Sequence, residues 1–405
     1  MESEKIESEK IESEKIELVS VVMPVYNGED YIEETIKCVV DQTYRTIELI
    51  IVDDGSTDNT AEIVKSLMND DSRIKYYYRE KGNAGVQRNY GFEQSKGEFL
   101  LFLDSDDLFE RDMIEKMINK IIIDKADICV CNADQYNTEN GEYVSKPQYL
   151  RMKAIPEEIP FSRKSIGNKI LYFTTSVPWN KLIKREFIEN NNLRFQDIER
   201  ANDQLFSIMA LVMAESITIV EDVLVHYRVK QKGNLTTDFS QTPLCAFWSM
   251  LESSKCLSEK GLLDDENVRC ALDNKIANLM IYSLNIQKDI AGYKELYELL
   301  HNGGFEKLGF ILKDKEYYFD PLEFENIKKI MLMSYDEFLL TKNREYRDVI
   351  AKKNQTYKNM LSQKNEKIAE LKEKEKELNA IKRKNWYKKI TKLIAQYHRV
   401  IGKED

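Results

Sequence analysis

Three carboxylates, Asp104, Asp106 and Asp107, directly follow the apolar run 99–103. Carboxylates held this close repel one another unless a cation lies between them. Mg²⁺ and Mn²⁺ prefer oxygen ligands, and either ion can bridge carboxylates to nucleotide phosphates. The spacing therefore predicts an Mn²⁺ or Mg²⁺ site with Asp104 and Asp106 as ligands. Taken alone, an Asp-x-Asp pair is equally typical of an ordinary turn or helix cap.

Two earlier apolar runs also end in residues that could bind a ligand. The first, 18–25, leads into Tyr26 and Asn27, and the second, 47–52, leads into Asp53 and Asp54. In open α/β sheets the ligand lies outside the carboxyl ends of the strands. Paired acids at such an end suit hydrogen-bond donors, such as a base N–H or ribose hydroxyls, or a metal ion.

The elements that must position these residues alternate along the chain. From 18 to about 232, short β-rich apolar runs alternate with amphipathic stretches that predict helices near 31–42, 59–67 and 85–94. This alternation predicts β-α-β units around a mostly parallel sheet. Beyond about 238 the apolar residues recur at three- and four-residue spacing, which predicts an all-α region.

Other nucleotide-binding and metal-binding motifs are missing. The sequence contains no G-x-x-x-x-G-K-[ST] and no G-x-G-x-x-G after a strand, which argues against a P-loop ATPase and a dinucleotide dehydrogenase. Phe109 occupies the position where a calcium-binding EF-hand loop requires glycine. The six cysteines form no C-x-x-C pair, so we expect reduced thiols and no zinc site.

Composition limits the partners and the location. The 405 residues carry a net charge of −10, which argues against binding nucleic acid through bulk charge. The longest apolar runs fall far short of the ~20 residues that span a bilayer. Residues 1–17 carry an acidic pentapeptide repeat without the apolar core of a signal peptide, so we expect a solvated tail and a cytoplasmic protein.

The C-terminal part predicts a coiled coil followed by a basic amphipathic helix. Glycine and proline vanish from 342 to 384, and apolar residues keep heptad spacing, interrupted by Asn354, Lys364 and Glu375. Seven Lys or Arg residues and no acid lie between 382 and 401, with Trp386 and Ile390 among the residues of one apolar face. The coiled coil predicts a homo-oligomer. The last helix fits either a partner chain or the inner face of the plasma membrane.

Taken together, these stretches resemble the family 2 glycosyltransferases of bacterial surface-glycan type, which have the GT-A fold. The resemblance rests on 19–60 and 81–107 and extends over about 18–228. It implies a GT-A nucleotide-diphospho-sugar transferase fold. It also implies that Asp53 and Asp54 contact the base and ribose, and that Asp104 and Asp106 hold the metal and diphosphate. The donor site is expected to include four further residues, Pro24, Tyr26, Asn27 and Arg88.

The acceptor half carries looser marks of the same family. Asp203 stands where members have the proposed general base, but the usual preceding Glu is replaced by Asn202, which puts the local electrostatics of the pair in question. Trp179 and Lys181 match a Trp-x-Lys-Leu segment, and Trp179 could equally be a core residue. Two further residues are candidate phosphate or acceptor contacts, His226 and Arg228, although His226 could equally be a packed strand histidine.

The resemblance implies an inverting glycosyltransferase that moves a sugar from a nucleotide-diphosphate sugar to a hydroxyl group. The family's habits favour UDP as the nucleotide, and a glycan or lipid-linked acceptor in surface polysaccharide or glycoconjugate synthesis. With one placed base, direct displacement inverts the anomeric centre. Two alternatives remain: a processive polysaccharide synthase, and a non-catalytic coiled-coil scaffold with a relic nucleotide-sugar fold. A processive synthase would normally show Gln-x-x-Arg-Trp and membrane spans, and the sequence has neither.

The predicted organisation is a low-complexity tail at 1–17, a GT-A domain at 18–235, a helical region at 236–341, a coiled coil at 342–384 and a basic amphipathic helix at 385–405.

Overall fold

A computed structural model describes residues 17–80, 82–229 and 241–401 of the chain. The chain divides into two compact units, Met1–Met333 and Ser334–Asp405. Most of the pentapeptide repeat predicted as a tail lies outside the described residues, as does 230–240 after the last strand.

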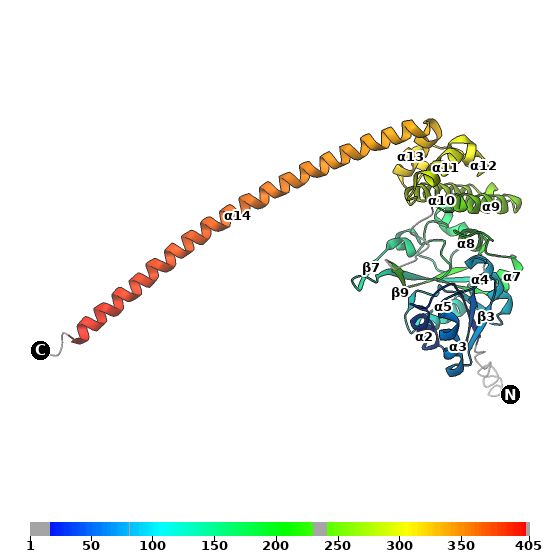
Figure 1. Cartoon of the computed structure of the whole chain (residues 1–405), viewed down its shortest axis with the longest axis horizontal. Helices are drawn as coiled ribbons and strands as arrows, with labels where there is room; N and C mark the ends of the chain where they lie inside the picture. The colour runs from blue at the N-terminus through cyan, green and yellow to red at the C-terminus, as the bar shows by residue number, and fades with distance from the viewer. Residues whose placement is uncertain (1–16, 81, 230–240, 402–405) are drawn as a thin grey trace, which may run out of the picture. The chain divides into compact units, whose positions relative to one another are not determined.

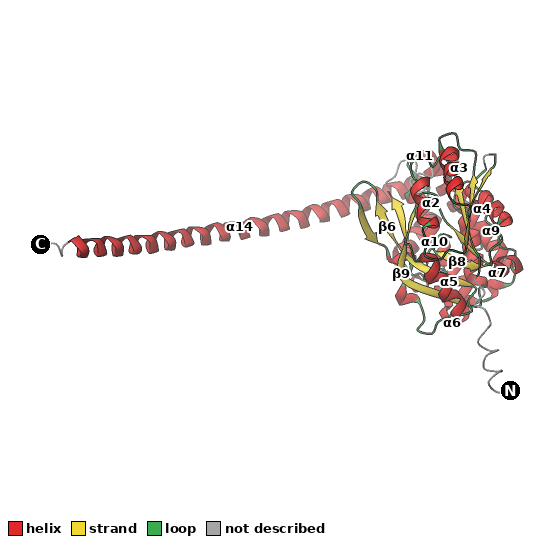
Figure 2. Ribbon diagram, turned by 90° about the horizontal axis from the view of Figure 1, so that it is seen from below, coloured by secondary structure: helices red, strands yellow, loops and turns green. Residues whose placement is uncertain are grey.

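Within the described residues, nine strands form one sheet in the order β3-β2-β1-β4-β8-β6-β9-β5, with β7 paired to β6. Figure 2 draws the strands in yellow among the helices in red. The strands are β1 (Val19–Val25), β2 (Ile47–Asp53), β3 (Ile74–Tyr78), β4 (Phe99–Phe102), β5 (Leu108–Phe109), β6 (Ile128–Asn137), β7 (Glu142–Ser145), β8 (Lys181–Lys184) and β9 (Ile217–Val229). All residues of β1 and β2 are buried. Burial on both faces explains why these strands read as continuous apolar runs.

The sheet is mixed, which corrects the prediction of a mostly parallel one. Strands β3, β2, β1 and β4 are parallel to one another, as predicted. The direction reverses at β8, which lies antiparallel between β4 and β6. Strand β9 is parallel to β6, whereas the two-residue β5 is antiparallel to β9. An apolar run records burial but not strand direction, so the reversal has no signal in the sequence.

Helices cover both faces of the sheet, and those predicted near the N-terminus are confirmed. They are α2 (Ile32–Val40), α3 (Thr60–Asp70) and α4 (Ala84–Gln94), and the structure adds α5 (Met113–Ile123), which was not predicted. The apolar faces of α2 and α5 join one core with alternate residues of β1 and β2. Helix α4 lies against the other face, where a Cβ on Gly91 would come within 2.4 Å of Val22 Cγ1. Glycine at this position therefore allows the close helix-to-strand approach.

The predicted all-α region is helical and belongs to the same compact unit as the sheet. Its helices are α9 (Cys245–Glu259), α10 (Glu266–Asn285), α11 (Ile290–Leu299), α12 (Phe305–Lys307) and α13 (Pro321–Leu332), gathered near α8 (Asp203–Met213) in Figure 1. Two shorter helices are α6 (Arg163–Ile166) and α7 (Arg185–Asn190). Ser249 Oγ of α9 donates a hydrogen bond to the Ala201 carbonyl (3.0 Å), directly before α8. These helices, α9 to α13, form a helical layer that is attached through this bond to the segment that carries Asp203.

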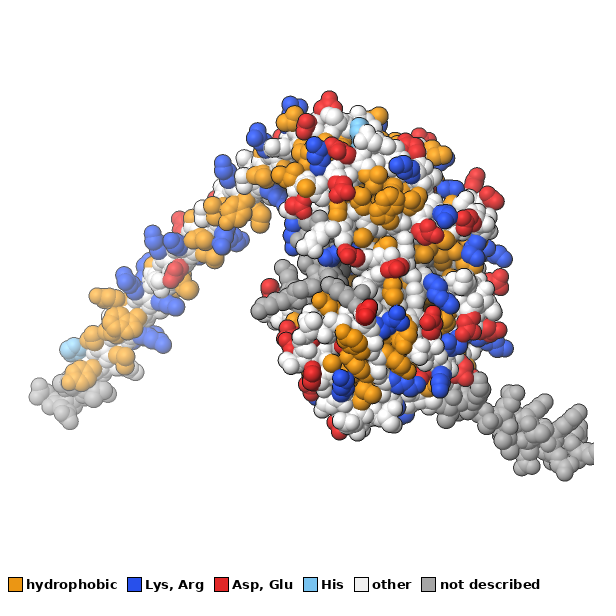
Figure 3. All heavy atoms as spheres, turned by 45° about the vertical axis from the view of Figure 1, so that its right-hand side comes forward, with side chains coloured by type: hydrophobic (Ala, Val, Ile, Leu, Met, Phe, Trp, Pro, Cys, Tyr) orange, Lys and Arg blue, Asp and Glu red, His pale blue; other side chains and the backbone are white. Residues whose placement is uncertain are grey.

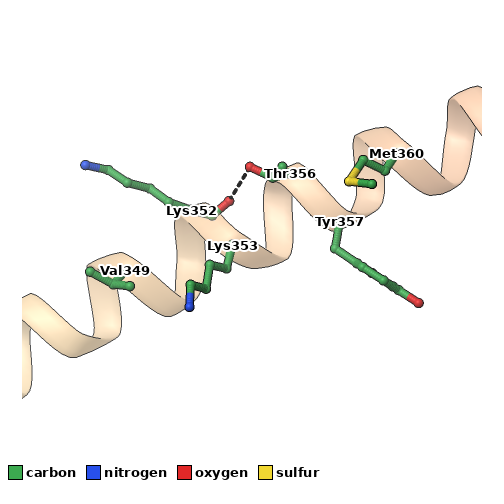
Figure 4. Close-up of a pocket in the computed structure, with 6 residues that line it drawn as sticks. All are labelled: Val349, Lys352, Lys353, Thr356, Tyr357 and Met360. Atoms are coloured by element: carbon green, nitrogen blue, oxygen red, sulfur yellow. Dashed lines mark hydrogen bonds between the residues drawn. The ribbon is translucent and has the colours of Figure 1, made fainter. Parts of the chain in front are cut away.

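The second unit consists mainly of α14 (Tyr335–Ile401), a single helix of 67 residues. It runs without a break across the boundary predicted between the coiled coil and the basic helix at 384–385. The hollow drawn in Figure 4 is lined by residues of this one helix, including Val349, Tyr357 and Met360, so it marks an exposed apolar stretch and not an enclosed pocket. The coiled coil stays a prediction. Among the described residues, we find no helix that is both long and apolar enough to cross a membrane.

Candidate active site

The loops that follow β1 and β2 are joined by hydrogen bonds. Asn27 has a φ of 49°, a left-handed conformation that asparagine tolerates better than most residues. Its backbone N–H donates to Ser56 Oγ (2.9 Å), and its Oδ1 accepts from the Thr57 N–H (2.8 Å). Tyr26 is 45% exposed beside this junction, whereas Pro24 is a buried residue of β1. Two of the candidate donor-site residues, Tyr26 and Asn27, therefore lie in the loop, and Pro24 lies in the strand that supports it.

The two acids after β2 have different surroundings. Asp53 is fully buried, and its carboxylate accepts hydrogen bonds from the Ser56 N–H (2.8 Å) and the Tyr76 hydroxyl (2.6 Å). Burial and this bond to Asp53 raise the pKa of Tyr76 above its usual value. Asp54 Oδ1 accepts from the Gly82 N–H (2.6 Å) and from the Gln87 amide. Asp53 thus holds the loop, and Asp54 joins it to the start of α4.

The acidic cluster after β4 brings three carboxylates together. Asp104, Asp106 and Asp107 each offer an oxygen, and these atoms lie within 4.8 Å of one another. Asp107 is fully buried; its Oδ1 accepts from the Arg228 N–H (2.9 Å), but its Oδ2 has no hydrogen-bond partner. Burial raises the pKa of Asp107 well above its usual value, and the charges of Asp106 and Asp104 raise it further. An oxygen-only donor set with an unpartnered buried oxygen fits a hard divalent cation such as Mg²⁺ or Mn²⁺.

Arg88 connects this cluster to the segment that precedes Asp203. Its Nη2 donates to Asp104 Oδ1 (2.6 Å), and its Nη1 donates to Asn202 Oδ1 (3.0 Å). The guanidinium group is 7% exposed and lies 5.3 Å from the centre of the Phe195 ring. The planar fork of an arginine can make two such bonds at once, which a lysine cannot do with the same geometry.

Asp203 is the first residue of α8 and is half-buried. Burial raises the pKa of Asp203; the positive charge of Arg88 opposes this shift, and the negative charge of Asp104 adds to it. The loop before Asp203 is fixed to α4 from several sides. Asn89 exchanges two hydrogen bonds with the backbone of Phe195 (2.9 and 2.8 Å), and Asn83 donates to Asp197 (2.6 Å).

The helical layer contributes two residues that the sequence did not reveal, Ser249 of α9 and Lys275 of α10. Ala201 has a φ of 55°, which is rare for a residue with a side chain, and its carbonyl accepts the bond from Ser249 of α9. Lys275 of α10 lies close enough to Asp203 for their charges to interact; burial lowers the pKa of Lys275 to about 8, against the effect of Asp203. Along α10, the sequence offers no sign that distinguishes Lys275 from a lysine on a solvated face.

Two candidate acceptor contacts, Trp179 and Lys181, lie inside the protein. Trp179 is 2% exposed and stacks on Tyr227, with ring centres 5.9 Å apart. Lys181 is fully buried, and its ammonium group donates to the carbonyls of Thr175 (2.8 Å) and Val177 (2.7 Å). Burial lowers the pKa of Lys181 to about 7. Both side chains are engaged by packing and hydrogen bonds within the fold.

The other two candidates lie at the pairing of β5 with β9. His226 Nδ1 lies 2.7 Å from Asp134 Oδ1, and its Nε2 lies 3.0 Å from Glu110 Oε1, so both ring nitrogens have protein partners. Arg228 donates to Glu34 of α2 (2.6 Å) as well as to Asp107. Arg228 therefore lies directly beside the acidic cluster, while His226 is held one step further away.

An α/β sheet whose strand-end loops meet an acidic cluster, facing a carboxylate at a helix start, is the architecture of a nucleotide-sugar transferase. Comparisons with known proteins agree. Residues 20–190 match the family model described as glycosyl transferase family 2. Glycosyltransferase GlyG of Streptococcus pneumoniae serotype 4 (strain TIGR4) is 30% identical over 300 residues, which cover 73% of this chain and 95% of GlyG. The chain therefore belongs to glycosyl transferase family 2.

Two further similarities are to a poly(ribitol-phosphate) glycosyltransferase and to a structure with a bound nucleotide sugar. Poly(ribitol-phosphate) β-N-acetylglucosaminyltransferase TarP of Staphylococcus aureus (strain N315) is 34% identical over 209 residues, which cover 50% of this chain and 60% of TarP. The crystal structure of S. aureus TarS 1–349 in complex with UDP-GlcNAc has a TM-score of 0.62 at 19% identity, covering 82% of this chain and 91% of that one. The second likeness shows that the fold is shared, helical layer included.

Proposed function

We propose that this protein is a metal-dependent, inverting glycosyltransferase that transfers a sugar from a UDP-sugar to a hydroxyl group of a glycan or lipid-linked acceptor in surface polysaccharide synthesis. The observation that carries the proposal is the link through Arg88, which joins Asp104 of the acidic cluster to Asn202, the neighbour of Asp203. A donor site and a candidate base are thereby held in one rigid arrangement. Similarity to TarP and to the UDP-GlcNAc complex of TarS supports the acceptor and donor classes.

Asp203 acts as the general base in this proposal. Its carboxylate takes the proton from the acceptor hydroxyl while that oxygen attacks the anomeric carbon, and the bond from this carbon to the diphosphate oxygen breaks. A pKa raised by burial makes Asp203 a stronger base than a solvated aspartate. A single displacement from the opposite side inverts the anomeric configuration. No second carboxylate is assigned as a nucleophile.

Asp104 and Asp106 would hold Mn²⁺ or Mg²⁺, and a bound ion would neutralise charge on the leaving diphosphate. Tyr26, Asn27 and Asp54 lie on the loops expected to face the base and ribose, and Asp53 acts through the loop that it holds. Arg88 and Arg228 add two positive charges next to the acidic cluster. The proposal assigns a contact with the acceptor to Lys275 of α10, whose charge interacts with that of Asp203.

Release of UDP from a panel of UDP-sugars tests this function, with and without poly(ribitol-phosphate) or lipid-linked acceptors, with added Mn²⁺ and with excess chelator. We expect turnover with at least one donor that stops with chelator, and NMR of the product should show inversion. A product with retained configuration would refute the single displacement. Absence of turnover with every donor would favour a non-catalytic scaffold, and a long polymer from one initiation would favour a processive synthase.

A further inference from the structure

The end of α14 combines exposed aromatic and aliphatic side chains with a run of cations (Figure 3). Trp386, Tyr387, Leu393, Ile394 and Tyr397 are between 51% and 70% exposed. Between 382 and 401 the chain carries Lys382, Arg383, Lys384, Lys388, Lys389, Lys392 and Arg399 and no acid, although the protein as a whole has a net charge of −10. This segment therefore differs in charge from the rest of the molecule.

From Trp386 onward the helical geometry separates these two kinds of side chain, whereas Arg383, one turn earlier, falls on the apolar side. At about 100° per residue, the five exposed apolar residues fall within an arc of roughly 120°. Lys388, Lys392 and Arg399 lie on the opposite side of the helix by the same geometry. Because α14 is continuous through this segment, the two faces persist over several turns. An apolar face of this width, opposed by cations, is typical of a helix that lies in a membrane interface.

The apolar face at the end of α14 does not continue the predicted coiled-coil seam. Seven residues after Leu378 comes Asn385, and the other heptad position continues from Ile368 through Glu375 to Lys382 and Lys389. The seam has become polar where the terminal apolar face begins. Parallel pairing of two copies would also bring two sets of seven cations together, and such like charges repel.

We propose that residues 382–399 dock the enzyme on a bilayer that contains anionic lipid, with the aromatic and aliphatic face in the interface. Charge complementarity selects this partner over a second copy of the chain. The cations attract the negative surface, and the apolar face leaves water on contact. Docking of this kind would keep the catalytic unit beside a lipid-linked acceptor, but the docking itself does not depend on the proposed activity.

Flotation of the full chain with vesicles tests the docking. We expect the protein to float with vesicles of phosphatidylcholine and 30–40% phosphatidylglycerol at low salt, and to remain at the bottom with pure phosphatidylcholine. K388E/K392E and W386A/L393A should each lower the bound fraction at least tenfold. K352E/K353E makes the same charge change elsewhere on α14 and should float like the wild type. Circular dichroism checks that all variants keep their helix content.

Two outcomes overturn the docking proposal. One is failure of the wild type to float with anionic vesicles at low salt. The other is equal flotation of the wild type and K388E/K392E while K352E/K353E loses binding, which would move the surface elsewhere. Sedimentation of the same proteins without lipid tests whether this face binds a second copy of the chain instead. Self-association that W386A/L393A abolishes would assign the face to a second copy.

Discussion

The bond between Arg88 and Asn202 can be tested by removing one partner at a time. In Asn202→Ala, Arg88 loses the acceptor that lies 3.0 Å from its Nη1 but keeps Asp104 at 2.6 Å. A hydrogen bond to a charged group contributes about 1.5–3 kcal/mol, which corresponds to roughly 10–150-fold in rate if the whole loss appears in the transition state. We expect kcat to fall by about 10–100-fold, because Asp203 follows Asn202 directly. The dissociation constant of UDP should change by less than about threefold.

Initial rates of UDP release give kcat, and calorimetric titration with UDP gives the donor affinity. Asn140→Ala is the matched control, since Asn140 lies in the exposed turn between β6 and β7 and bonds only locally, to Glu142. Arg88→Lys completes a double-mutant cycle, and we expect a coupling energy of about 0.5–3 kcal/mol with Asn202→Ala. If Asn202→Ala keeps wild-type kcat, or if the two changes prove additive, the link does not position the base.

Three further predictions follow from the site. Asp106→Ala should abolish the metal dependence of donor binding with an unchanged unfolding midpoint, because the residue lies in a loop; full turnover in excess chelator would refute it. Asp203→Asn should lower kcat about 10²–10⁴-fold at unchanged UDP affinity. In the wild type, kcat/KM should fall tenfold per pH unit below the pKa of Asp203, because only the ionised carboxylate accepts a proton. Burial raises this pKa above the usual value for aspartate. If Asp203→Asn shows the same fall at low pH, Asp197 or Glu199 becomes the next candidate for the base. Ser249→Ala should lower kcat roughly 2–10-fold, which is the equivalent of one neutral hydrogen bond. UDP affinity should stay unchanged, and Ser249→Thr should restore kcat. A fall in UDP affinity alone would contradict the idea that Ser249 positions the segment before Asp203.

The parts of this fold that the sequence predicted are those that local patterns encode. Apolar runs located β1, β2 and β4, and the polar residues at their ends located the loops. Strand direction at β8 was not predictable, since it depends on which strands become neighbours. Residue type alone did not reveal that Trp179 and Lys181 are buried, because an aromatic ring or an ammonium group can contact a ligand or pack in the interior equally well.

The contacts across the candidate site join residues that are far apart in the sequence. Arg88 and Asn202 are separated by 114 positions, and Ser249 and Ala201 by 48. The stretch before Asp203 has an irregular backbone with a left-handed alanine, so no periodicity announces it. Only the family resemblance singled out Asp203, and nothing in the sequence indicated that α9 and α10 support it.

The structure also gives a physical reason why asparagine can replace glutamate before the base. A carboxylate at position 202 would compete with Asp104 for Arg88 and would place a second negative charge beside Asp203. The added negative charge would raise the pKa of Asp203 beyond the shift that burial already causes. The neutral amide of Asn202 still accepts the bond from Arg88, so the loop stays fixed while the guanidinium charge remains balanced by Asp104. In the proposed mechanism, asparagine at position 202 therefore preserves the positioning of Asp203 and leaves more positive charge beside the acidic cluster.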